Sequence, residues 1–218
     1  MKKISKKKAV LFTLFIFPLV FFLLLSTGIN NFTRLPVITP KIYDISNIDT
    51  ANVIRLKDKI SILCFLGYDI DKVKGSFFNL NQKIYKPFYD FKDFQIVAIY
   101  PKESAPAVHT LKSDLGNFTD MIKWNFIPAS DAQIDTLYNS LQTKSSLPPT
   151  KYSSRAFIVD KDLNLRGRTN DKDSKYGLLF GYNMQSVAEL NNKMKDDVKV
   201  VLAEYRLALK KNKRNREI

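Results

Sequence analysis

The sequence predicts an α/β sandwich with a mixed sheet, preceded by one N-terminal transmembrane helix. Three observations lead to this fold class. A long apolar run without charged residues follows the first eight residues. Short, almost wholly apolar segments then alternate with segments whose apolar residues recur at helical spacing. Finally, a hairpin-like segment precedes one long amphipathic helix near the C-terminus, a pattern that completes a layered α/β domain.

The N-terminal segment has the features of a membrane anchor. Residues 1–8 hold five lysines and form a predicted cytoplasmic basic tail, and Ala9 to Leu25 contains no charged residue. With its flanking residues, the anchor covers 9–28, about 20 residues, which as a helix crosses the hydrocarbon core of a bilayer. A cleaved signal peptide is the alternative, but no Ala-x-Ala cleavage site follows the run. We therefore expect a retained single-pass anchor in the bacterial inner membrane, with the domain facing the periplasm.

The first part of the outer domain, which we predict to cover 51–211, contains two expected strands and a helix. Residues 29–50 are rich in proline and predict an extended linker, followed by a short strand at Val53–Leu56. Ile60–Leu66 is apolar at nearly every position, which is typical of a strand buried on both faces. A polar loop, Gly67–Gly75, separates it from a predicted helix with apolar residues at helical spacing: Phe77, Leu80, Ile84 and Phe88.

The central part alternates strands and helices. Gln95–Pro101 predicts a second buried strand, and Ala107–Leu115 a short helix that ends at Gly116. Met121–Pro128 predicts a third strand. Ser130 and Gln133 have the spacing of a capping box, so a helix begins there.

The last part begins with a predicted hairpin. Its strands are Arg155–Asp160 and Leu165–Arg168, joined by a tight turn. A long amphipathic helix is expected from Asn183 to about Lys211, and residues 212–218 form a second basic tail.

Composition excludes several classes of site and partner. The chain has one cysteine and one histidine, which rules out an intramolecular disulfide and any metal cluster of several cysteines or histidines. The formal net charge is +14, but ten basic residues lie at the two ends, and the body has 25 basic against 20 acidic residues. Because a nucleic-acid-binding protein needs a basic surface on its body, we expect no nucleic-acid partner.

The order of these elements, with the segments ISILCFLG and AFIVDKDLNLRGR, resembles a thioredoxin-like fold, and within it the membrane-anchored Sco/SenC group. The resemblance covers roughly Leu35 to Lys210. It implies a CxxxC motif in the loop after the first buried strand, and a histidine before the hairpin that completes a copper or redox site. Thiolate and imidazole ligands suit Cu(I) and thiol exchange.

The residues that would form such a site are absent from this chain. Asp69 and Asp71 stand where the two thiols belong, and Tyr152 or Ser153 stands near the position of the histidine. The resemblance therefore implies a fold without its redox and copper ligands, and we expect no cofactor. The domain is then not an enzyme but a binding or assembly factor for another envelope or respiratory membrane protein.

The expected partner-binding surface surrounds this former site. It consists of Tyr68, Asp69, Asp71, Lys72, Lys74, Tyr152 and Arg155. Two other functions stay open. One is a redox or metal-delivering protein that uses Cys64, or Asp69 with Asp71 as ligands for a hard cation; however, the apolar neighbours of Cys64 favour an inert core thiol, and a turn or helix-start role is favoured for both aspartates. The other is a structural subunit of a larger membrane complex.

Overall fold

A computed structural model describes residues 6–26, 34–48, 54–174 and 176–214. The chain divides into two units, Met1–Thr33 and Arg34–Ile218. The described part of the first unit is one helix, α1 (Lys6–Ser26), with Pro18 inside it and exposed apolar side chains from Val10 to Leu24. Within the described residues, however, no helix meets the length and hydropathy required to cross a bilayer. The predicted transmembrane anchor is therefore not supported by this criterion.

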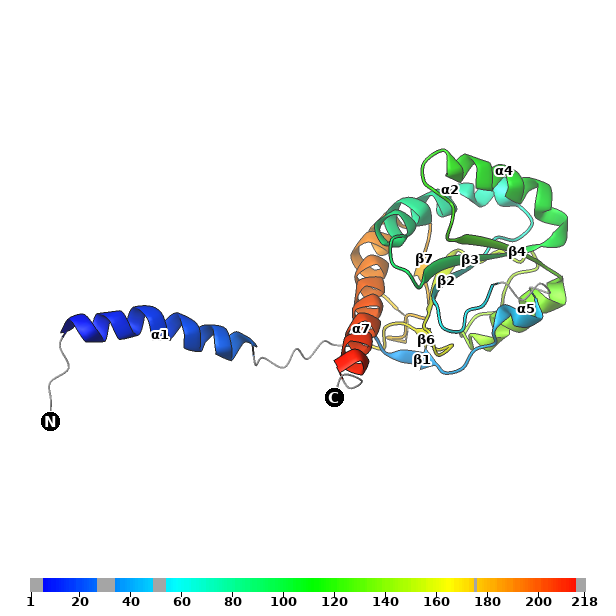
Figure 1. Cartoon of the computed structure of the whole chain (residues 1–218). Helices are drawn as coiled ribbons and strands as arrows, with labels where there is room; N and C mark the ends of the chain where they lie inside the picture. The colour runs from blue at the N-terminus through cyan, green and yellow to red at the C-terminus, as the bar shows by residue number, and fades with distance from the viewer. Residues whose placement is uncertain (1–5, 27–33, 49–53, 175, 215–218) are drawn as a thin grey trace. The chain divides into compact units, whose positions relative to one another are not determined.

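The second unit is built on a mixed sheet of seven strands (Figure 1). The strands follow the order β1-β6-β5-β2-β3-β4, and β7 pairs with β5. Strands β2, β3 and β4 are parallel to one another, whereas β5 runs antiparallel to β2, β6 and β7, and β1 runs antiparallel to β6. Their bounds are β1 (Val37–Thr39), β2 (Ile60–Phe65), β3 (Phe94–Pro101), β4 (Trp124–Ala129), β5 (Arg155–Val159), β6 (Leu165–Arg166) and β7 (Tyr182–Asn183).

Helices cover both faces of this sheet (Figure 1). One face packs against α2 (Ile70–Leu80), α4 (Ala105–Gly116) and the C-terminal α7 (Lys195–Arg214). The other face packs against α5 (Asp131–Ser140) and the segment around the short helix η1 (Ile45–Asn47). Successive residues of β2 alternate between the two cores, with Cys64 in the first and Leu63 in the second. The sheet is thus buried on both sides, as the apolar strands predict.

Short turns extend or interrupt the main helices. The segment after α2 continues as one π-helical turn, η2 (Asn81–Tyr85), and then α3 (Lys86–Phe88). Another π-helical turn, η4 (Leu190–Met194), joins α6 (Val187–Glu189) to α7, and η3 (Lys102–Ser104) precedes α4.

The expected mixed α/β architecture is confirmed, but several boundaries differ. The strand expected at Val53–Leu56 does not form over its described residues 54–56, and Val53 lies outside the described residues. Part of the segment assigned to a linker forms β1, which pairs with β6. The last helix begins at Val187, because Ser186 caps its N-terminus and Asn183 belongs to β7.

The C-terminal helix is fixed to the hairpin by ion pairs in which at least one partner is buried. Arg166 of β6 contacts Asp160 at 3.0 Å and Glu204 of α7 at 2.7 Å, and its guanidinium also donates to the carbonyl of Leu35. Arg168 contacts Asp197 at 2.6 Å. Breaking such a pair leaves a buried charge unpaired, so these contacts define one arrangement of α7.

Candidate functional site

The junction between β2 and α2 is shorter than the sequence indicates. A polar loop was expected over Gly67–Gly75, but α2 already begins at Ile70, whose side chain is buried in the core. Only Gly67, Tyr68 and Asp69 lie outside the helix and past the bridge that Leu66 forms with Tyr152. The expected loop is wrong over 70–75, because burial of Ile70 outweighs the local polar composition.

Gly67 allows the chain to turn against a neighbouring segment. Its φ is +72°, and a Cβ there would lie 2.5 Å from the carbonyl oxygen of Thr150 and 2.7 Å from the Cβ of Tyr152. Only glycine adopts this conformation without strain and leaves space for this approach. The carbonyl of Gly67 also accepts a hydrogen bond from Ser104 Oγ at 3.2 Å. The junction is therefore packed closely rather than open.

Tyr68 is held by hydrogen bonds from its backbone and from its side chain. Its backbone N–H donates to Thr150 at 3.0 Å, and its hydroxyl donates to Asp131 Oδ1 at 2.7 Å at the start of α5. The bond to Asp131, with the negative charges around it, raises the pKa of Tyr68 to about 12. Lys151 also connects its own segment to α5, because its ammonium lies 2.6 Å from Asp135 and 3.8 Å from Asp131.

Sequence reasoning missed Asp131, Asp135 and Lys151 as part of this site. The two aspartates are one helical turn apart on α5, which brings both near one lysine. Nothing in the local sequence connects them to Tyr68, because 63 positions separate it from Asp131. The spacing of the aspartates on a capped helix was the only signal available.

The charged residues at the start of α2 point to solvent. Asp69, Asp71, Lys72 and Lys74 are exposed, and Asp69 forms an exposed ion pair with Lys72 at 3.2 Å. Asp69 is the N-cap residue of α2 and Asp71 lies in its first turn, so both stand at the expected helix start, although the side chain of Asp69 makes no capping hydrogen bond. Among the described residues, no group of three or more histidine, cysteine or acidic side chains could hold a metal ion.

Tyr152 does not face outward with these residues, whereas Arg155 is exposed. Tyr152 is half-buried, its hydroxyl lies 3.1 Å from Ser76 Oγ of α2, and its ring meets Phe77 edge-on. Burial raises the pKa of Tyr152. Arg155 donates to the carbonyl of Gly181 at 2.7 Å, beside β7. Thus Tyr152 packs against the buried side of α2, and Arg155 connects β5 to the segment before the last helix.

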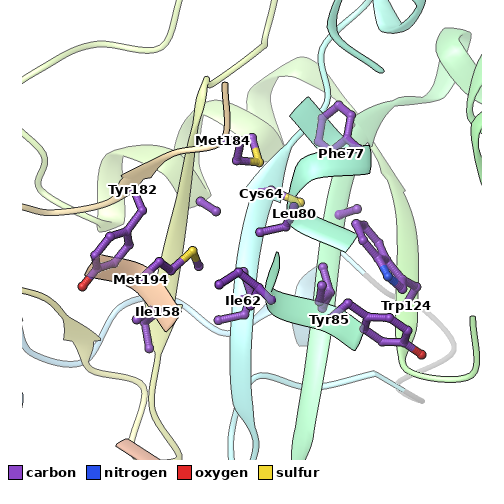
Figure 2. Close-up of a cluster of buried hydrophobic side chains, with 14 of the residues drawn as sticks. Ile62, Cys64, Phe77, Leu80, Tyr85, Trp124, Ile158, Tyr182, Met184 and Met194 are labelled. Atoms are coloured by element: carbon purple, nitrogen blue, oxygen red, sulfur yellow. The ribbon is translucent and has the colours of Figure 1, made fainter. Parts of the chain in front are cut away.

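Cys64 lies in the core, as expected. Its side chain is 0% exposed, and its thiol donates to the carbonyl of Val97 at 3.6 Å. Figure 2 shows its sulfur among apolar side chains that include Leu80 and Met184. Burial raises the pKa of this thiol far above its ordinary value, so the reactive thiolate does not form at neutral pH.

Comparisons with known proteins give the fold class and little more. No family model matches the sequence, and no curated protein matches it. Among solved structures, BsSco, a member of the Sco family of cytochrome c oxidase assembly proteins, superimposes with a TM-score of 0.51 at 12% identity. That match covers 78% of this chain and 98% of BsSco.

Two further solved structures are similar at lower scores. A SCO1/SenC family lipoprotein from Bacillus anthracis str. Ames has a TM-score of 0.43 at 14% identity, over 79% of this chain and 99% of its own. A thiol:disulfide interchange protein of the thioredoxin family from Chlorobium tepidum TLS has a TM-score of 0.45 at 16% identity, over 80% of this chain and 99% of its own. The mixed α/β fold is consistent with the thioredoxin-like class.

Proposed function

We propose that this protein is a membrane-associated, thioredoxin-like binding or assembly factor that works without redox chemistry. The observation that carries the proposal is the state of the β2–α2 junction. The single cysteine of the chain is buried in the strand before it, and the junction itself is occupied by Gly67, Tyr68 and Asp69. A protein with this junction acts through what it contacts rather than through thiol exchange.

The contact surface that we propose consists of Tyr68, Asp69, Asp71, Lys72 and Lys74. Tyr68 is 40% exposed, and the hydrogen bond from its hydroxyl to Asp131 holds the ring in one position. A rigid tyrosine surrounded by charged residues of both signs is a favourable centre for a protein interface, because little side-chain entropy is lost on binding. Tyr152 supports this surface from inside, whereas Arg155 is exposed beside β7, where it donates to the carbonyl of Gly181.

Association with a membrane would come from α1. Its large apolar side chains from Val10 to Leu24 are exposed on all sides of the helix, which favours burial in lipid. The outer domain would then lie in the bacterial envelope, on the periplasmic side. Its partner would be another envelope or respiratory membrane protein, which is the role that the likeness to the Sco-type assembly proteins suggests.

Site-specific photo-crosslinking of the full chain in cells that naturally make it tests this proposal. A photoreactive residue in place of Lys72 is expected to give one discrete protein adduct, and adding Tyr68→Ala should reduce its yield about tenfold, a loss typical of an interface anchor. Tyr89→Ala is the matched control, because Tyr89 is also 40% exposed but lies elsewhere. Equal adduct yields in the two tyrosine variants would contradict the proposal.

A further inference from the structure

An open basic hollow lies at the amino ends of the three parallel strands β2, β3 and β4. Tyr68 lies at the opposite, carboxyl ends of these strands. Its volume is about 380 Å³. Five of its lining residues are basic, and among the described residues that line it none is acidic. The basic residues are Arg55, Lys57, Lys59, Lys92 and Lys123.

The parallel register explains why these residues meet. Ile60 pairs with Phe94, and Ile96 pairs with Trp124, so the starts of β2, β3 and β4 lie side by side. Lys59 immediately precedes β2, Lys123 immediately precedes β4, and Lys92 comes two residues before β3. Parallel strands place all their N-terminal flanks at one edge of a sheet, so the three lysines converge although the sequence separates them.

Carboxylates outside the lining neutralise part of this charge, because Asp93 attracts Lys59, Lys92 and Lys123, and Asp90 attracts Lys123. Lys57 is 3.4 Å from Asp162, and the ammonium of Lys123 donates to the carbonyl of Phe91 at 2.5 Å. Within the described residues, Arg55, Lys59 and Lys92 have no ion-pair partner. Partial burial and the positive charge of Lys59 lower the pKa of Lys123, as two close cations repel each other.

The floor of the hollow is a fixed polar network rather than a mobile surface. Gln95 is almost fully buried, and its amide nitrogen donates to the carbonyl of Arg55 at 2.7 Å and to Ser61 Oγ at 2.8 Å. Its amide oxygen accepts from Asn125 Nδ2 at 3.1 Å. These bonds hold the backbone of Arg55 beside β3, so the hollow exists before any ligand arrives.

We propose that this hollow binds a phosphate-bearing anion. Arginine and lysine side chains around one concave site are the groups that bind phosphate oxygens, and a bound anion would relieve the repulsion between Lys59 and Lys123. The phosphate comes either from an anionic lipid head group or from a free phosphorylated compound, since both present the same oxygens. The inference is independent of the contact surface proposed around Tyr68.

Calorimetric titration of the full chain in non-ionic detergent micelles tests the proposal and distinguishes the two sources. The probes are inorganic pyrophosphate, phosphatidylglycerol added to the micelles, and phosphatidylcholine as a neutral comparison. We expect saturable binding of one or both anions, no binding of phosphatidylcholine, and affinity that falls as salt is raised. Binding of phosphatidylglycerol alone would identify the lipid source, and binding of pyrophosphate alone the soluble one.

Charge-removing variants locate the binding. Lys59→Gln with Lys92→Gln should weaken it about tenfold, since the loss of two contacts of this kind amounts to about 1.4 kcal/mol. Lys102→Gln with Lys112→Gln removes two exposed charges away from the hollow and should leave affinity unchanged. Arg55→Gln with Lys57→Gln is a second test pair, in case the first unfolds. Absence of binding by both anions, or equal weakening in test and control pairs, would overturn the proposal.

Discussion

The carboxyl and amino ends of the parallel strands β2, β3 and β4 differ in whether their polar groups are hydrogen-bonded or ion-paired within the domain. At the carboxyl end, Gly67 packs against Thr150, and Tyr68 bonds to Asp131. At the amino end, Lys59 and Lys92 have no ion-pair partner within the described chain, and a hollow of about 380 Å³ lies beside the strand starts. The end of the strands at which a thiol site was expected is thus closed by internal contacts, whereas the opposite end is open and charged.

The largest expected effect concerns the packing of the carboxyl end. Gly67→Ala should lower the free energy of unfolding by about 3 kcal/mol, because a Cβ at φ +72° is strained and meets the backbone of Thr150. Urea unfolding of the full chain measures this loss. Gly75→Ala is the matched control: no atom lies within 4 Å of its Cβ position inside α2, so alanine there should stabilise by about 0.5–1 kcal/mol. If Gly67→Ala left the free energy of unfolding unchanged, the junction would be loosely packed.

A smaller effect is expected from the repulsion at the amino end. The folded-state pKa of Lys123 is lowered, so between that pKa and the ordinary lysine value the unfolded chain binds more protons, and stability rises with pH. Lys59→Gln removes part of the repulsion. It should therefore raise the pKa of Lys123. Because the variant also removes the attraction between Lys59 and Asp93, the free energy of unfolding at neutral pH should change by less than about 0.3 kcal/mol.

The pKa of Lys123 can be followed by NMR of its side-chain ammonium group during a pH titration. Lys112→Gln, on the exposed face of α4, is the control and should leave that pKa unchanged. If the pKa of Lys123 stays the same in Lys59→Gln, the two ammonium groups do not interact and the amino end is not a cluster of like charges.

Local sequence patterns predicted the helices and strands that are determined by neighbouring residues in the sequence. The apolar runs identified β2, β3 and β5, and Ser130 with Gln133 forms the capping box that begins α5. The burial of Cys64 also followed from its apolar neighbours. In contrast, β1 and β7 have three and two residues, which is too short for a period-2 pattern, and their existence depends on pairing with distant strands.

The sites depend still more on tertiary structure. From the sequence, Ile70 is predicted to lie in a polar loop. In the structure its side chain is buried in the core and α2 begins at this residue, so Asp71, Lys72 and Lys74 belong to the helix. The basic hollow combines residues from three strand starts between Arg55 and Lys123, so a search for a continuous basic stripe in the sequence missed it. Only the order of the parallel strands brings these charges together.

Thiol labelling of Cys64 in the native full chain shows directly whether the carboxyl end of the strands carries a reactive thiol. We expect no reaction with a thiol reagent at neutral pH until denaturant unfolds the domain, followed by labelling of one thiol per chain. The reaction should therefore follow the unfolding curve. Labelling of the folded protein at a rate close to that of a free thiol would show that Cys64 is accessible and reactive, and would restore a redox role for it.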